Sequence, residues 1–279
     1  MYFFRQPETE KIMQKTLLFS LLLLSGTIFA QTPEQIIRKI YPKYSQKNQC
    51  HQVQNDDSGD YCMRLHKRKI RDTAQGKLMY LLYRGNHFDF TENREDGAHV
   101  LSGLAGFFVL KQKSGNDWEL LASAPRENVG SYGNAPEEWT FHEFGKDKWG
   151  FLTTHGDVHQ GVYGSHYVLL HHNGGRKIGV SWLGASISNY GFYGDNCERY
   201  EDEPKRQKDC VKNTLTSLDS KIKILRDQTP SGGFYPIQIT VDGHTGQKKY
   251  RQQVFRMNFD TKSGKYIEPK NYVLKNIDY

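Results

Sequence analysis

The chain has 279 residues, of which 37% are hydrophobic, 25% charged and 13% aromatic, and its formal net charge is +7. This composition is that of a globular protein long enough to bury a core, and it excludes a coiled coil, a collagen-like chain and long disorder. The basic excess is mild, and its two clusters at 66–69 and 248–251 lie in alternating, strand-like segments. We therefore expect no nucleic-acid partner.

The N-terminal segment has the features of a secretory signal peptide. Lys15 precedes an uncharged, leucine-rich run over 16–30 that ends in the small residue Ala30. We expect residues 1–30 to be removed, with Met13 as an alternative start, which leaves a single β-rich domain over 31–279. An uncleaved membrane anchor is the alternative, but the apolar run is shorter than a typical bilayer span. These features predict a periplasmic or secreted protein without a transmembrane anchor after processing.

All four cysteines follow that segment, and export makes disulfide bonds the default. Four cysteines allow three pairings. We favour Cys50–Cys62 and Cys197–Cys210 because each pair closes a short polar loop, which is worth about 3 kcal/mol in the loop-entropy model. A zinc site is the alternative, but no CxxC spacing is present.

The first predicted element of the mature chain is a short N-terminal helix. Thr32 is a suitable cap, Pro33 suits the first helical position, and Pro42 ends the helix. The polar residues 45–62 that follow are expected to form a loop.

From residue 65 onward, apolar and polar residues alternate between turn residues, which indicates strands. Turns rich in Gly, Asn, Asp and Ser join neighbouring strands and predict hairpins. The predicted fold is all-β, an antiparallel meander that forms a sandwich or an irregular barrel, with a small propeller-like array as the second choice. Polar, irregular segments are expected at 84–100 and 193–216. The strands are expected at 65–72, 77–83, 103–112, 118–123, 138–144, 149–154, 166–172, 178–184, 220–225, 235–241, 250–259 and 266–268.

Histidines are concentrated in one region, since six of the eleven lie between residues 142 and 172. In an extended segment, His155, Asp157 and His159 face the same side, and imidazole with carboxylate suits zinc or iron. These three residues are therefore a candidate metal site, and the corresponding function is a metal-dependent hydrolase assisted by His142 or His166. The glycines at 156 and 161 favour a turn that would separate the side chains. The leading prediction includes no cofactor.

Aromatic residues follow the histidines, among glycines, serines and asparagines. Tyr163, Tyr190, Phe192 and Tyr193 are candidate ligand-binding residues, because aromatic rings beside polar groups make contact surfaces for sugars and proteins. No complete nucleophile–base set is present, so no catalytic residue is assigned and a non-enzymatic role is favoured.

The leading prediction is an exported binding protein that recognises a protein or glycan ligand of the cell envelope. Its binding segments are expected at 84–100, 154–166 and 186–200, and an inhibitor or immunity-type role is one version of this function. A structural envelope protein without a discrete site is a further alternative.

Overall fold

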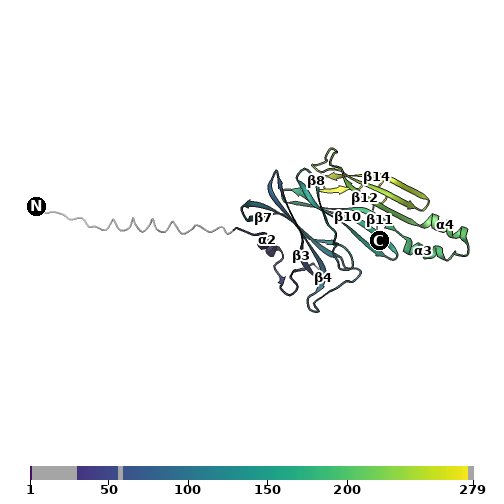
Figure 1. Ribbon diagram of the computed structural model, residues 1–279, viewed down its shortest axis with the longest axis horizontal. Helices are drawn as coiled ribbons and strands as arrows, with labels where there is room; N and C mark the ends of the chain where they lie inside the picture. The colour runs from purple at the N-terminus through teal and green to yellow at the C-terminus, as the bar shows by residue number, and fades with distance from the viewer. Residues whose placement is uncertain (2–29, 56–58, 276–279) are drawn as a thin grey trace.

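The computed structural model describes Met1 and residues 30–55 and 59–275, except for the side chains at 193–195. These residues form two antiparallel β-sheets with a few short helices (Figure 1), so the predicted all-β antiparallel architecture is confirmed. Each sheet is continuous rather than divided into propeller blades. Within the described ranges, no helix has the length and apolar character needed to cross a membrane. The predicted signal peptide lies almost entirely outside those ranges.

The first sheet has the strand order β1-β2-β3-β4-β6-β7, and the short β5 pairs with β4. Every pairing in it is antiparallel, as expected for strands joined by hairpins. Its strands are β1 (Tyr44–Ser45), β2 (Cys50–Gln54), β3 (Asp60–Thr73), β4 (Gly76–Asp89), β5 (Arg94–Glu95), β6 (Gly103–Ser114) and β7 (Asp117–Val129).

The second sheet follows in the chain and has the order β15-β14-β13-β12-β11-β10-β9-β8. It is a pure meander, because every strand pairs with its neighbours in sequence. Its strands are β8 (Thr140–Gly145), β9 (Lys148–His159), β10 (Val162–Gly174), β11 (Lys177–Ser188), β12 (Thr216–Ile224), β13 (Ile237–Thr245), β14 (Lys248–Asp260) and β15 (Lys265–Ile267).

The predicted N-terminal helix is α2 (Pro33–Ile40), and it begins with the expected cap. The Thr32 hydroxyl accepts from the main-chain N–H of Gln35, and the Gln35 side chain accepts from the main-chain N–H of Thr32, so two free helix N–H groups are satisfied. The buried face of the helix, with Ile36 and Ile37, packs on the outer face of the first sheet.

The central strands β4 and β6 are buried on both faces. On one face, Met79, Leu81 and Phe108 contact the cluster beneath α2. On the other face, Leu78 and Phe107 join a cluster that holds the two sheets together. This explains the nearly continuous apolar runs at 78–83 and 104–110, which a sheet with one solvent-exposed face does not require.

A second core lies on the face of β10 and β11 that points away from the first sheet. Leu169 and Leu183 meet Ile239 and Phe255, which belong to the later strands of the same sheet. The second sheet is therefore curled, so that its C-terminal half covers one face of its N-terminal half (Figure 1).

Three irregular segments expected from the sequence contain regular structure. The expected loop at 45–62 holds β2 and the start of β3, and the first part of the 84–100 loop is the end of β4. The segment at 193–216 forms most of two helices, α3 (Tyr190–Glu198) and α4 (Pro204–Thr214). These helices were missed because neither has an amphipathic pattern with a buried apolar stripe, and none of the α4 side chains is buried.

Both disulfides join the pairs favoured above. Cys50–Cys62 crosses from β2 to β3 and packs with Phe88, and both of its cysteines are buried. Cys197–Cys210 joins α3 to α4. Two disulfides suit a protein of an oxidising compartment.

The two disulfides are expected to stabilise different parts of the molecule. In the variant Cys197→Ser with Cys210→Ser, trypsin should cut the 190–214 segment faster, because α4 has no buried side chain to hold it once the link is lost. The main thermal unfolding transition should change little. The variant Cys50→Ser with Cys62→Ser is the matched comparison and should lower that transition, because its sulfurs are part of a buried cluster. Equal trypsin cleavage of the 190–214 segment in the wild type and the first variant would contradict this account.

Candidate functional site

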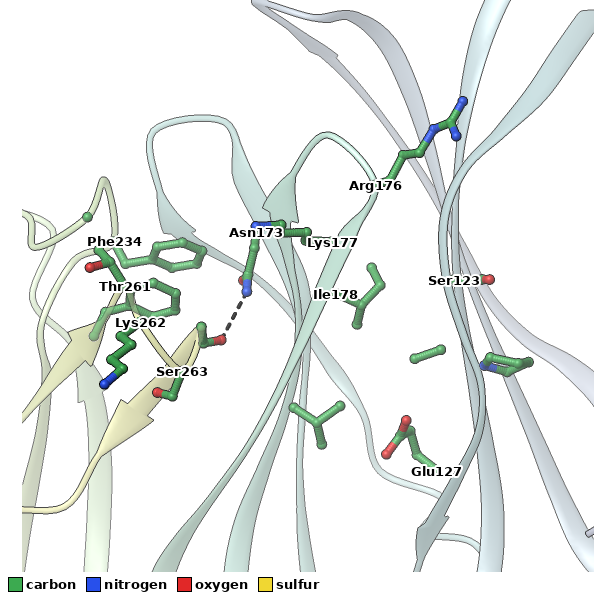
Figure 2. Close-up of a pocket in the computed structure, with 16 residues that line it drawn as sticks. Ser123, Glu127, Asn173, Arg176, Lys177, Ile178, Phe234, Thr261, Lys262 and Ser263 are labelled. Carbon is green, nitrogen blue, oxygen red and sulfur yellow. Dashed lines mark hydrogen bonds between the residues drawn. The ribbon is translucent and has the colours of Figure 1, made fainter. Parts of the chain in front are cut away.

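An open cleft of about 720 Å³ lies beside β11. One wall is β7, with Ser123, Pro125 and Glu127, and the opposite wall is the turn at 261–264 between β14 and β15 (Figure 2). The floor is the first part of β11, where Ile178 and Val180 face the first sheet. We call this cavity the β7–β11 cleft.

The cleft exists because two strand edges face each other without pairing. β7 is the last strand of the first sheet, and Pro125 lies at an irregularity in its pairing with β6, since proline cannot donate a ladder hydrogen bond. Tyr41 from the end of α2 donates its hydroxyl to the Pro125 carbonyl oxygen at 2.5 Å and fixes this irregularity. β11 pairs with β12 only through Ile187 and Ser188, so its earlier residues are left to line the cleft.

The charged groups of the cleft are mostly cationic. Arg176, Lys177 and Lys262 line it, and Glu127 is the one carboxylate among its described lining residues. Burial raises the pKa of Glu127, and nearby Lys265 partly offsets that rise. Within the described part of the chain, none of the three lining cations pairs with a carboxylate. The cleft is therefore suited to a negatively charged ligand.

Asn173, at the tip of the β10–β11 hairpin, fixes the turn wall of the cleft. Its side-chain amide nitrogen donates to the Gly264 carbonyl oxygen at 2.9 Å (Figure 2). Its main-chain carbonyl oxygen accepts from the Lys148 ammonium at 2.8 Å. The turn itself is closed by Asp260, whose carboxylate accepts from the main-chain N–H of Ser263. The wall is thus held to β9 and β10 by hydrogen bonds as well as by packing.

Behind this wall lies His171, which is completely buried. Since the Asn173 amide nitrogen faces Gly264, the Asn173 side-chain oxygen faces His171 Nδ1 and accepts a hydrogen bond from its N–H at 2.6 Å. His171 Nε2 then accepts from the Ser181 hydroxyl at 3.0 Å, and Ser181 in turn accepts from the main-chain N–H of Tyr266. Burial lowers the pKa of His171 to about 4, so the ring is neutral at pH 7.

The sequence-predicted metal residues lie farther along the same seam between the sheets. β9 stays regular through residue 156 up to His159, so the turn expected at Gly156 is absent and only Gly161 is in a turn. His155, Asp157 and His159 do share one face, and on a strand the Cα atoms of His155 and His159 lie about 13 Å apart. No group of three potential ligands around a single ion is found among the described residues.

Each of these residues has partners of its own. His155 Nδ1 accepts from the main-chain N–H of Gly130, and its ring meets the edge of Trp182. Burial, with a smaller contribution from the nearby His166, lowers the pKa of His155 to about 4. Asp157 lies 3.8 Å from Nε2 of His99. The metal site stays a prediction, and His99 is a neighbour that no sequence spacing indicated.

The sequence-predicted aromatic residues lie at one end of the second sheet. Tyr163 is on β10, and Tyr190 and Phe192 are on α3, with exposed fractions of 41%, 59% and 45%. The β9–β10 turn touches the start of α3, where Gly161 approaches Gly191 closely. Tyr193 belongs to α3, but its side chain is outside the described part. The role of these four residues in ligand binding stays a prediction.

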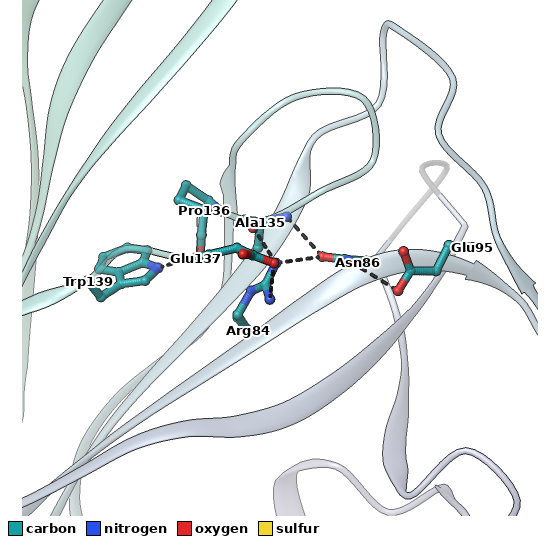
Figure 3. A network of polar contacts seen from close by, with 7 residues as sticks. All are labelled: Arg84, Asn86, Glu95, Ala135, Pro136, Glu137 and Trp139. Carbon is teal, nitrogen blue, oxygen red and sulfur yellow. Dashed lines mark hydrogen bonds and ion pairs between the residues drawn. The ribbon is translucent and has the colours of Figure 1, made fainter.

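The beginning of the predicted binding loop at 84–100 has a structural role. Arg84, on β4, donates to the Ala135 carbonyl oxygen at 2.7 Å and lies 3.3 Å from the Glu137 carboxylate (Figure 3). Asn86 accepts from the Ala135 N–H and donates to Glu95. These contacts fix the segment that leads from the first sheet into the second.

No family model, curated protein or solved structure matches this chain. The lining of the β7–β11 cleft was missed by sequence reasoning, because Glu127, Arg176 and Lys262 come from three distant segments. Arg176 and Lys262 lie in polar hairpin turns, and nothing in the pattern of such turns distinguishes a binding residue from a solvated one. The cleft is therefore recognised only from the packing of the two sheets.

His171 predicts a pH-dependent stability. Between pH 6.5 and pH 4 the unfolded chain binds a proton at this residue that the folded chain does not, so the free energy of unfolding falls as the pH falls through this window. The slope is about 1.4 kcal/mol per pH unit for one such residue. The variant His171→Gln should be less stable at pH 7 but should lose part of this slope in urea unfolding measured at several pH values.

The exposed His159 supplies the control for this measurement. The variant His159→Gln should keep the slope of the wild type. A His171→Gln variant with the slope of the wild type would show that His171 does not contribute to the pH dependence.

Proposed function

We propose that this protein is an exported, non-enzymatic binding protein that holds an anionic ligand in the β7–β11 cleft. The observation that carries the proposal is the composition of the cleft, in which Arg176, Lys177 and Lys262 face a single carboxylate, Glu127. Its volume of about 720 Å³ lies in the range of cavities that hold small ligands. A wall fixed by Asn173 lowers the cost of ordering the site when the ligand binds.

The ligand class that best matches this lining is an acidic oligosaccharide. The hydroxyls of Ser123 and Thr261 in the lining can pair with sugar hydroxyls. Ile178 and Val180 supply an apolar floor for the carbon face of a sugar ring. Trp182, the next residue on that face of β11 beyond the floor, is 38% exposed and adds an aromatic ring to that face.

The chemistry of the lining favours binding over hydrolysis. Hydrolysis of a glycosidic bond usually uses two carboxyl groups on opposite sides of the bond. Glu127 is the one carboxylate among the described residues of the cleft, and the other charged groups are cations, which attract a negatively charged ligand.

The predicted signal peptide and the two disulfides support export to the periplasm or the outside of the cell. Acidic glycans of the cell envelope are ligands that such a protein meets there. The sequence predicted a protein or glycan ligand at the aromatic residues Tyr163, Tyr190, Phe192 and Tyr193. The present proposal is more specific, because it names a glycan as the ligand and the cleft as its site.

The direct test is calorimetric titration with trigalacturonate, and with uncharged galactotriose as the comparison. The wild-type protein should bind the acidic sugar and not the neutral one, with an affinity that falls as salt is added. Lys177→Ala with Lys262→Ala should weaken binding about tenfold or more, since a hydrogen bond to a charged group is worth about 1.5–3 kcal/mol. Lys248→Ala with Lys249→Ala, on β14 and outside the cleft, removes the same charge and should leave binding unchanged.

A substitution of Glu127 should change the affinity in the opposite direction to the lysine substitutions. The variant Glu127→Gln removes the one negative charge of the lining and should bind trigalacturonate several-fold more tightly, with the gain shrinking at high salt. If wild type binds both sugars equally, or if both lysine pairs have the same effect, the cleft is not the site of an anionic ligand.

A further inference from the structure

β3 has an edge that lacks a strand partner over much of its length. β2 pairs only with its first residues, from Asp60 to Met63, whereas β4 pairs with the opposite edge as far as Thr73. A register irregularity lies between Leu65 and Lys67, and the pairing with β4 is regular after it. Among the described residues, no strand covers the other edge of Lys67–Thr73, which we call the free edge.

The free edge is strongly basic. Its sequence places Lys67, Arg68, Lys69 and Arg71 against one carboxylate, Asp72. Lys67, Lys69 and Arg71 face the second sheet, because their partners on β4 are Leu82, Tyr80 and Leu78 of the core between the sheets. Arg68 is on the opposite face. Positive charge therefore flanks the unpaired main chain on both sides.

Two of these cations have no fixed counter-charge in the described structure. Arg68 is paired with Glu34 of α2 at 2.7 Å, and Arg71 lies over the ring of Trp149 at 4.6 Å. Lys67 and Lys69 form no ion pair among the described residues. An incoming acidic ligand can therefore pair with them without first breaking an ion pair.

The free edge also offers main-chain and apolar contacts. The Ile70 carbonyl oxygen accepts from the neighbouring Arg71 guanidinium at 2.8 Å, so a donor from outside the sheet can reach this carbonyl. The Ile70 side chain is 43% exposed. An added strand forms main-chain hydrogen bonds along such an edge and places alternate side chains on the two faces of the sheet.

We propose that the free edge of β3 binds an extended acidic segment of another protein, which adds to the first sheet as an antiparallel or parallel strand beside Lys67–Thr73. Acidic side chains at alternate positions of that segment pair with Lys67 and Lys69, and an apolar side chain on the other face covers Ile70. Main-chain hydrogen bonds then give affinity, and the lysines select the charge of the partner.

Charge argues against a second copy of this chain at the same edge. Pairing two free edges would set lysines and arginines opposite one another, and like charges directly across a sheet are destabilising. Basic residues on an exposed edge are a common device against such self-pairing. A membrane surface would engage the lysines but would leave the N–H and C=O groups of the edge without partners.

The free edge shares no residue with the β7–β11 cleft, so the two proposals can fail separately. The probe for the edge is a fluorescent eight-residue peptide of alternating glutamate and valine, measured by anisotropy with the full mature chain. We expect saturable binding. The same peptide, N-methylated at alternate residues, keeps its charge but cannot form the ladder, and it should bind about tenfold more weakly or not at all.

Substitutions test the role of the lysines. Lys67→Glu with Lys69→Glu should abolish peptide binding, and the milder Lys67→Gln with Lys69→Gln should weaken it about tenfold. Lys248→Glu with Lys249→Glu is the charge-matched control and should leave it unchanged. All variants should keep the circular dichroism spectrum and the thermal unfolding transition of the wild type, which establishes that they are folded independently of any ligand in the cleft.

Three results would overturn the proposal. Equal binding of the N-methylated peptide would show that charge alone, without strand addition, holds the peptide. Unchanged binding after the Lys67 and Lys69 substitutions would place the peptide elsewhere. Binding to phosphatidylglycerol vesicles that depends on these lysines, with no peptide binding, would identify a membrane surface as the partner.

Discussion

The burial of β4 and β6 on both faces is the constraint on which the rest of the structure depends. Phe108 and Leu81 pack beneath α2, while Phe107 and Leu78 pack against the second sheet. Truncating one of these buried leucines or phenylalanines to alanine typically costs about 2–5 kcal/mol. Because the two middle strands are fixed in this way, the two outer regions of the first sheet, β7 and the free part of β3, take defined positions relative to the second sheet.

The two proposed binding surfaces follow from those outer strands. β7 faces β11 across a gap that side chains do not fill, and turns rich in lysine and arginine close the gap into a cleft. β3 extends beyond β2 and leaves an unpaired edge whose charge opposes self-association. Basic residues therefore lie both at the cleft and along the unpaired edge that the backbone leaves open.

Much of the fold follows from local sequence patterns. The Thr32 cap and Pro33 fixed the start of α2, and the alternation of polar and apolar residues located strands such as β13 and β14. Local patterns did not predict elements that are held in place by disulfide bonds. β2 is polar in composition but is tied to β3 by Cys50–Cys62, and α4 has no buried stripe and is tied to α3 by Cys197–Cys210. The cleft could not be predicted at all, because Glu127 and Lys262 are brought to one cavity only by tertiary packing.

The central claim is that an anionic ligand binds between β7 and β11 rather than on the aromatic surface that the sequence indicated. Hydrogen exchange of residues 31–279, measured with and without saturating trigalacturonate, tests this most directly. The account predicts slower exchange at 123–127 and 261–264, which form the two walls of the cleft, and at 176–180, which forms its floor. Slower exchange confined to 154–166 and 186–200 would contradict it and would assign the ligand to the surface around Tyr163 and Tyr190.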